Sequence, residues 1–292
     1  MNRLTPNEPA GPRRPADDAA RACPVCGSPA HLKPFYRSKD WLVVRCMRCT
    51  FAWAVDLDEA PKSTAFTWGE DVVRESQQRE SMYRDRLARV ERYQPAPRIW
   101  LDVGCGGGGL LKCARDAGYE VEGIELSPSA DVITREFGIP VHKLPLAEVV
   151  GQLRHRAFGV VSYFHVLEHV PDPVGELRLA KTLLGPQGVL VVEVPFFDSL
   201  PWKVLGSRHR HFYRGHRSYF NRQSLEAILM ATGFGVLEAG SVPYQMTADW
   251  LLMRLGSPAQ RVRRSLPPRI LRRSVPINTG EYLLAIARAA PV

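Results

Sequence analysis

Leu101-Asp102-Val103-Gly104-Cys105-Gly106-Gly107-Gly108-Gly109-Leu110-Leu111 joins a short apolar run to a cluster of glycines and then to further apolar residues. This order predicts a buried strand, a tight turn and the start of a helix, because glycine tolerates the positive φ angles of close turns. Roughly twenty residues later, another apolar strand, Val121-Glu122-Gly123-Ile124-Glu125-Leu126, also ends in an acid. A carboxylate at that spacing is well placed to bind a ribose, so the two signals support each other.

The acid at the end of the first strand indicates which ligand the glycine turn accepts. A glycine turn at a helix N-terminus often binds phosphate, but the carboxylate of Asp102 would repel one. Asp102 instead suits an amino-acid-like ligand, whose ammonium pairs with the carboxylate while its chain lies against bare backbone. On these residues the chain resembles the S-adenosylmethionine-dependent methyltransferases with a Rossmann-like fold.

Two later stretches extend the resemblance in the right order. One is similar to the family's fourth strand and the helix entry after it, and it reads Phe158-Gly159-Val160-Val161-Ser162-Tyr163-Phe164-His165-Val166-Leu167-Glu168-His169-Val170-Pro171-Asp172-Pro173. The other resembles the end of a helix, a turn and the fifth strand, and it reads Leu183-Leu184-Gly185-Pro186-Gln187-Gly188-Val189-Leu190-Val191-Val192-Glu193-Val194-Pro195. Many relatives carry Asp where this chain has Gly159, and an adenine-contacting acid that the segment 141–146 lacks.

The resemblance implies an α/β fold with a Rossmann-like, seven-stranded and mostly parallel sheet, helices on both faces, and S-adenosylmethionine as cofactor. The residues that it implies for cofactor binding lie in the glycine turn, at the strand ends and in the segments that follow them: Asp102, Gly104, Cys105, Gly106, Gly108, Glu125, Leu126, Leu144, Phe164 and His165. We expect Cys105, and Cys113 on the next helix, to be small buried residues rather than nucleophiles.

Hydrophobic periodicity places the elements of this fold. Strands are predicted at 99–103, 120–125, 139–142, 158–163 and 188–194, and they alternate with helices at 108–117, 128–137, 146–153 and 173–184. A further helix within 221–234 runs from an Asn or Ser cap to a Gly stop, and 236–239 and 282–287 should form an antiparallel pair at the sheet edge. The ligand then lies beyond the carboxyl ends of the parallel strands, where Asp102, Glu125 and His165 all fall.

Four of the six cysteines form two Cys-x-x-Cys pairs about twenty residues apart: Cys23, Cys26, Cys46 and Cys49. Two such pairs complete the tetrahedral four-cysteine site of a zinc ribbon, so we expect a structural Zn²⁺. A redox dithiol is the alternative, although it needs only one pair. A module this small lacks a core and would depend on the metal for folding.

Composition predicts the remaining organisation of the 292 residues. We expect a disordered tail at 1–20, the zinc-ribbon module at 21–55, a helical linker or lid at 56–97 and the methyltransferase domain at 98–292. Within the linker, Tyr83 or Arg86 could reach the cofactor carboxylate, or they could be a packing tyrosine and a surface arginine. No apolar run is long enough for a transmembrane segment or a signal core, which favours a cytoplasmic protein.

The formal net charge of +9 is unevenly distributed. A basic insertion at about 245–275 holds seven arginines and no acid between Arg254 and Arg273. Such a run is a solvated surface or a contact for an anionic partner, which includes nucleic acid, a sugar nucleotide and peripheral membrane contact through 251–273.

Methyl transfer uses an activated donor, so positioning supplies much of the acceleration and a base is needed only for a protonated acceptor. His165, as a base with a pKa near neutrality or as a pocket wall, and His211, in a histidine-rich loop, are the catalytic candidates. The resemblance implies a methyltransferase acting on oxygen or carbon of a small-molecule, glycan or nucleotide-sugar acceptor, with a phosphate suiting the arginines. An RNA methyltransferase and a non-catalytic scaffold that keeps the cofactor fold are the alternatives.

Overall fold

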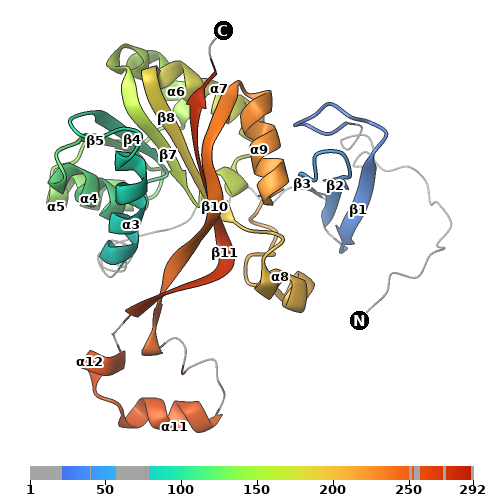
Figure 1. Ribbon diagram of the computed structural model, residues 1–292, viewed down its shortest axis with the longest axis vertical. Coiled ribbons are helices and arrows are strands. Elements are labelled where there is room, and N and C mark those ends of the chain that lie inside the picture. The colour runs from blue at the N-terminus through green and yellow to red at the C-terminus, as the bar shows by residue number, and fades with distance from the viewer. Residues whose placement is uncertain are drawn as a thin grey trace.

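The computed structural model describes residues 22–39, 41–56, 76, 79–249, 252, 257–271 and 274–290. The tail expected at 1–20 lies outside these residues, as do most of 57–78 and parts of the basic insertion. The described chain forms a seven-stranded sheet flanked by helices and a smaller four-stranded sheet beside it (Figure 1).

The large sheet confirms the predicted fold class. Its strands lie in the order β10-β11-β8-β7-β4-β5-β6, and the five from β8 to β6 are parallel. β11 runs antiparallel to both β8 and β10, as the expected antiparallel edge pair requires. The strand bounds are β4 Ile99–Val103, β5 Glu120–Ile124, β6 Val141–His142, β7 Phe158–Phe164, β8 Leu184–Pro195, β10 Phe234–Thr247 and β11 Ser274–Ala289.

Helices cover both faces of this sheet (Figure 1). One face carries α3 Glu80–Glu91, α4 Gly109–Asp116 and α5 Ser129–Phe137, and the other carries α6 Leu146–Leu153, α7 Pro173–Leu183 and α9 Arg222–Ala231. Local sequence fixes the helix starts. The Asp172 side chain accepts a hydrogen bond from the Gly175 amide at the start of α7, and Asn221 and Ser224 form a reciprocal capping box at the start of α9.

Alternation along the strands produces two hydrophobic cores. Trp100 and Val160 face the layer of α3 and α4, whereas Leu101 and Val161 face the layer of α6 and α7. Because successive strand residues point to opposite faces, every central strand is apolar on both sides. Of the buried acids, Asp102 and Glu193 lie within the last three residues of β4 and β8 and Glu125 follows β5 directly, whereas Glu122 lies within β5.

Some element bounds differ from the sequence expectations. The final two strands are far longer than 236–239 and 282–287, because they continue as a hairpin beyond the sheet. β8 begins at Leu184, which is extended and pairs with Phe158, although Gly185 and Pro186 indicated a turn there. β6 is only two residues long, since Gly123 and Ile124 are its paired positions on β5.

The small sheet joins the N-terminal segment to the main domain. It contains β1 Leu32–Arg37, β2 Trp41–Cys46, β3 Ala52–Asp56 and β9 Ser218–Tyr219, in that order. β9 comes from the chain after β8, so the sheet is shared between the predicted ribbon and the predicted catalytic domain. The module also has a hydrophobic core, made with residues that follow β8, which differs from the expectation of a coreless module.

The basic insertion forms the tip of the β10–β11 hairpin. It contains the helices α11 Ser257–Ser265 and α12 Pro268–Leu271, which lie beyond the end of the two strands (Figure 1). A short helix, α8 Leu200–Leu205, and the 3-10 turns at Arg154–Arg156, Leu167–His169 and Gly206–Arg208 complete the described elements. Among the described residues, none of the helices has the length and apolar content needed to span a membrane.

Candidate active site

The glycine turn between β4 and α4 is shaped by three positive φ angles. Gly104, Gly106 and Gly108 have φ values of +71°, +55° and +72°. A Cβ on Gly104 would lie 2.3 Å from Cγ2 of Val166, so this position requires glycine for space as well as for conformation. A Cβ on Gly106 would meet nothing within 4 Å, so the middle of the turn borders open space.

Asp102 lies near the end of β4 as a buried carboxylate beside this turn. Its Oδ1 accepts a 2.6 Å hydrogen bond from the Ser162 hydroxyl, which in turn accepts one of 2.8 Å from the Trp100 indole. Burial and the nearby charge of Glu125 raise the pKa of Asp102 to about 7, against the opposing effect of the Ser162 hydrogen bond. A cation bound at Asp102 would favour its ionised form.

Glu125, directly after β5, faces the same turn. Its Oε2 accepts a 2.8 Å hydrogen bond from the Gly106 amide, and its Oε1 accepts one of 2.8 Å from the Ser127 amide. Two apolar side chains follow the ends of β5 and β6 and remain open to solvent, with Leu126 64% and Leu144 47% exposed. Exposed leucines beside a carboxylate provide an apolar surface next to hydrogen-bonding groups, which suits a nucleoside.

Both cysteines near the turn are buried, as expected. The Sγ of Cys105 occupies the space over Gly123, where an added Cβ would lie 2.6 Å from it. Burial raises the pKa of Cys105 well above its ordinary value, and the charges of Asp102 and Glu125 raise it further. A thiol with a raised pKa is a weak nucleophile, so the packing interpretation of Cys105 agrees with its surroundings.

His165 follows β7 and has a positive φ of 59°, which is uncommon for a residue other than glycine. Its Nε2 lies 3.2 Å from Glu193 Oε1 and its Nδ1 lies 3.7 Å from Glu168 Oε1. Burial lowers the pKa of His165, but the hydrogen bonds and charges of the two carboxylates outweigh burial and raise the pKa to about 9. The expectation of a pKa near neutrality therefore differs from the structure.

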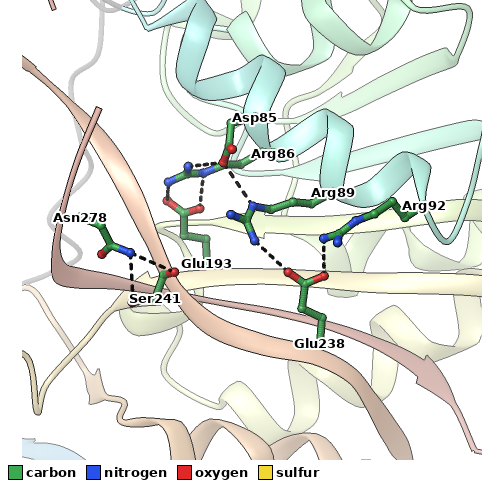
Figure 2. Close-up of polar contacts among 8 residues, drawn as sticks. All are labelled: Asp85, Arg86, Arg89, Arg92, Glu193, Glu238, Ser241 and Asn278. Atoms are coloured by element: carbon green, nitrogen blue, oxygen red, sulfur yellow. Dashed lines mark hydrogen bonds and ion pairs between the residues drawn. The ribbon is translucent and has the colours of Figure 1, made fainter. Parts of the chain in front are cut away.

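Glu193, which no sequence motif singled out, connects His165 to α3. Arg86 donates hydrogen bonds of 2.8 Å to Oε2 and 3.2 Å to Oε1 of Glu193, and both side chains are buried (Figure 2). Arg86 is therefore part of a buried ion pair, in which Asp85 also accepts a hydrogen bond from Arg86 Nη1. An acid within the apolar run of β8 was the available signal, since an unpaired carboxylate is not stable in a core.

His211 lies in the loop between β8 and β9. Burial and the neighbouring positive charge of Arg210 lower the pKa of His211 to about 2, so its imidazole is neutral. Its Nε2 is buried and has no hydrogen-bond partner among the described residues. His211 borders a small pocket whose other lining residues are Pro195, Phe196, Phe197, Trp202, His209, His216, Ser218 and Tyr219.

The structure brings the two candidate histidines to the same aromatic ring. The centroid of the Tyr282 ring lies 4.6 Å from that of His165 and 5.5 Å from that of His211. Arg210 Nη2 donates a 2.9 Å hydrogen bond to the Tyr282 hydroxyl. A protonated and a neutral imidazole thus both contact the Tyr282 ring on β11, close to the carboxyl end of β8.

Two groups of side chains have the chemistry of metal ligands. Donor atoms of Glu168, His169 and His216 lie within 4.8 Å of one another, and Glu168 Oε2 is buried without a hydrogen-bond partner in the described chain. The Sγ atoms of the four paired cysteines also lie within 4.8 Å, with 3.5 Å between Cys23 and Cys49 and 3.6 Å between Cys26 and Cys46. Tetrahedral zinc with Zn–S bonds of about 2.3 Å separates its sulfurs by about 3.8 Å, so this set fits zinc.

The N-terminal segment that carries the four cysteines contacts the histidine-rich loop between β8 and β9, called the histidine loop below, through backbone and aromatic groups. The Ala54 amide donates a 2.9 Å hydrogen bond to the Arg217 carbonyl, and the Arg217 amide donates one of 2.7 Å to the Glu168 carbonyl. The ring of Trp41 lies 5.2 Å from that of Phe212, the residue after His211. One short segment therefore ties the module to the end of β7.

Comparison with known proteins identifies relatives of this chain. Residues 75–239 match the model of a family described as "Methyltransferase domain". The ubiquinone biosynthesis O-methyltransferase of Burkholderia multivorans (strain ATCC 17616 / 249) is 38% identical over 177 residues, which are 54% of this chain and 74% of that protein. The protein of the same name from Haemophilus ducreyi (strain 35000HP / ATCC 700724) is 38% identical over 99 residues, which are 31% of this chain.

The chain spans about two fifths of the length of the first curated relatives that it matches, 42% for the Haemophilus ducreyi protein. Among solved structures, a SAM-dependent methyltransferase from Archaeoglobus fulgidus superimposes with a TM-score of 0.52 at 21% identity, covering 75% of this chain and 99% of that one. At this identity the likeness concerns the fold.

Proposed function

The chain belongs to the methyltransferase domain family, and from this premise we propose that it transfers a methyl group from S-adenosylmethionine to a hydroxyl oxygen of a small-molecule acceptor. The buried carboxylate of Asp102, with its pKa raised to about 7 beside an open glycine turn, is the observation that carries the cofactor assignment. The names of the matched relatives support oxygen as the methylated atom.

Each end of the cofactor has matching groups in the chain. Asp102 would bind the ammonium, and the bare backbone of Gly104, Gly106 and Gly108 would admit the amino-acid chain. Glu125 would accept hydrogen bonds from the ribose hydroxyls in place of the Gly106 and Ser127 amides. The remaining positions at the cofactor pocket, by our proposal, are Cys105, Leu126, Leu144, Phe164 and His165.

When bound, S-adenosylmethionine supplies a methyl group that is already activated on a sulfonium. The chain's own task is to orient the acceptor and to compensate charge at its oxygen. His211 is neutral with an unsatisfied buried Nε2, so it would accept the hydrogen bond of the acceptor hydroxyl. His165 is held protonated by Glu168 and Glu193, so it would not remove the hydroxyl proton. That proton would pass to the neutral Nε2 of His211, and from there to solvent, as the acceptor oxygen gains the methyl group.

The N-terminal segment has a structural part in this proposal. Cys23, Cys26, Cys46 and Cys49 would hold one Zn²⁺, as their sulfur spacing permits. The ribbon then comprises 22–56 together with β9. The methyltransferase domain extends from 98 to the last described residues, and α3 packs on one face of its sheet.

The test is transfer of a labelled methyl group from S-adenosylmethionine to a panel of phenols, sugars, nucleotide sugars and RNA. The proposal predicts alkali-stable label on the oxygen of a small hydroxyl acceptor, and a loss of at least about 100-fold in His211→Phe. Label on RNA alone would favour the RNA methyltransferase alternative. Cofactor binding without transfer to any member of the panel would favour the scaffold alternative.

A further inference from the structure

The tip of the β10–β11 hairpin has no part in the proposed reaction. Tyr282 pairs with Pro195, the last residue of β8, so the hairpin beyond this pair extends past the carboxyl edge of the large sheet. Figure 1 shows α11 and α12 at the far end of the hairpin, away from the helices that cover the sheet. The side chains that the tip exposes therefore need an explanation other than packing against the rest of the domain.

The sequence of the tip is strongly basic. Between Asp249 and Glu281 the sequence contains seven arginines and no acid. This segment therefore contributes most of the formal net charge of +9 of the whole chain. The side chains of Arg261, Arg264 and Arg269 are exposed. Arg263 instead forms a 2.6 Å ion pair with Asp249, which joins α11 to the segment that follows β10.

The same tip exposes aliphatic side chains. Val262 is 53% and Ile270 42% exposed, and Leu266 between the two helices is partly exposed. Ala259 and Val262 follow helical spacing along one side of α11, and Leu266 comes directly after its last residue, whereas Arg261 and Arg264 lie on the other side. Aliphatic groups opposite arginines are typical of helices that lie in the interface of a lipid bilayer.

We propose that this tip, comprising α11, α12 and Leu266, docks on the surface of an anionic lipid bilayer. The exposed arginines would contact headgroup phosphates, and Val262, Leu266 and Ile270 would enter the boundary with the acyl chains. This inference does not depend on the proposed methyl transfer. Because the hairpin leaves the sheet at its carboxyl edge, docking turns that edge toward the lipid.

The composition of the tip favours lipid over two other occupants. Between 251 and 273 the sequence contains no aromatic residue, whereas single-stranded RNA sites combine basic groups with aromatic rings that stack on bases. A second copy of the chain would bring the same arginines into a symmetric contact, where like charges repel.

The experiment is sedimentation of the full chain with vesicles of phosphatidylcholine alone and of phosphatidylcholine with phosphatidylglycerol at about 3:1. We expect binding to the anionic vesicles only, weakening as salt is raised. The double substitution Arg261→Gln with Arg264→Gln should lower the partition coefficient about 10- to 30-fold, and Val262→Asp should also lower it.

The matched control is Arg154→Gln with Arg178→Gln, which removes two exposed arginines elsewhere and leaves the same net charge. It should bind vesicles as the unsubstituted chain does, and thermal unfolding should show that all variants fold. If the tip and control variants lost vesicle binding equally, net charge alone would explain the loss, and the proposal would be overturned. Equal binding to both vesicle types, no vesicle binding, RNA binding alone, or concentration-dependent dimerisation through the tip would also overturn it.

Discussion

The side chains of His165 and Glu193 lie side by side at the carboxyl edge of the sheet, with Nε2 3.2 Å from Oε1. Their positions follow from strand register, since Phe164 pairs with Glu193 and His165 comes next. Arg86 donates hydrogen bonds to both oxygens of the same carboxylate. A proton on His165 is therefore stabilised by a carboxylate that is itself fixed in place.

The charge of His165 can be measured directly. Hydrogen bonds and charges of Glu168 and Glu193 outweigh burial and raise the pKa of His165 to about 9, so its imidazole resonances should titrate with a midpoint near pH 9. His211, with its pKa lowered to about 2 mainly by burial, should show no titration between pH 5 and 9. NMR of histidine-labelled protein checks both, and a midpoint for His165 near 6.5 would contradict the account.

The same pKa predicts how stability depends on pH. A folded-state pKa above the unfolded value of 6.5 means that the His165 contribution is fully present below about pH 6.5 and is lost as pH rises through about 9. The free energy of unfolding should therefore fall over this window, and His165→Gln should flatten the fall. Urea denaturation at several pH values measures it, with His155→Gln on the exposed Arg154–Arg156 turn as the control.

The ionised form of Asp102, which would bind the ligand, lowers the stability of the folded state. Burial raises the pKa of Asp102 to about 7, so at pH 8 the folded state carries a poorly solvated carboxylate. Asp102→Asn should raise the Tm at pH 8 by a few degrees, at about 2–4 °C per kcal/mol, and should have a smaller effect at pH 5, where the carboxyl is largely protonated. It should also weaken S-adenosylmethionine binding at least about 100-fold. Calorimetry tests both, and unchanged binding would remove Asp102 from the site.

Substitutions at two glycines of the turn should distinguish a loss of stability from a loss of cofactor binding. Gly104→Ala places a Cβ 2.3 Å from Val166 and should cost about 2 kcal/mol or more of stability. Gly106→Ala has open space, so it should cost only about 1 kcal/mol from its positive φ, yet block the cofactor. Denaturant unfolding and ligand titration of both variants check this, and equal effects on binding and stability in both would contradict it.

Metal removal should loosen the histidine loop. Because Ala54 and Trp41 contact the segment that follows β8, a chelator that removes zinc should speed amide exchange in residues 206–220 by about 10-fold or more. The glycine turn should be unaffected. Cys49→Ser should reproduce the effect and Cys113→Ser, at a buried thiol outside the cluster, should not. Hydrogen exchange by mass spectrometry provides the readout, and a loop indifferent to chelation would argue against the coupling.

The parts of the structure that the sequence predicted well are those with local signals. β4 and α6 begin and end at the predicted residues, because apolar alternation and the flanking Gly and Pro residues mark them. The sequence also predicted that Asp102 and Glu125 lie beside the glycine turn. Local signals suffice there, because the turn and both acids belong to one strand-turn-helix unit and the strand next to it.

The parts that the sequence did not predict depend on contacts between distant residues. Arg86 and Glu193 are 107 positions apart, and no local pattern connects them. The raised pKa of His165 required knowledge of strand register, and the shared sheet required β9, which is too short to give a periodic signal. The full length of β10 and β11 was hidden because they pair with each other beyond the sheet, outside any buried apolar pattern.

The most direct test of the central claim is calorimetric titration of the purified chain with S-adenosylmethionine and with its demethylated product, using a nicotinamide dinucleotide as control. We predict that the first two bind at micromolar concentration and that the dinucleotide does not bind. The affinity should rise as pH increases through about 7, because Asp102 must ionise. Folded protein that binds neither, or that binds the dinucleotide instead, would contradict it.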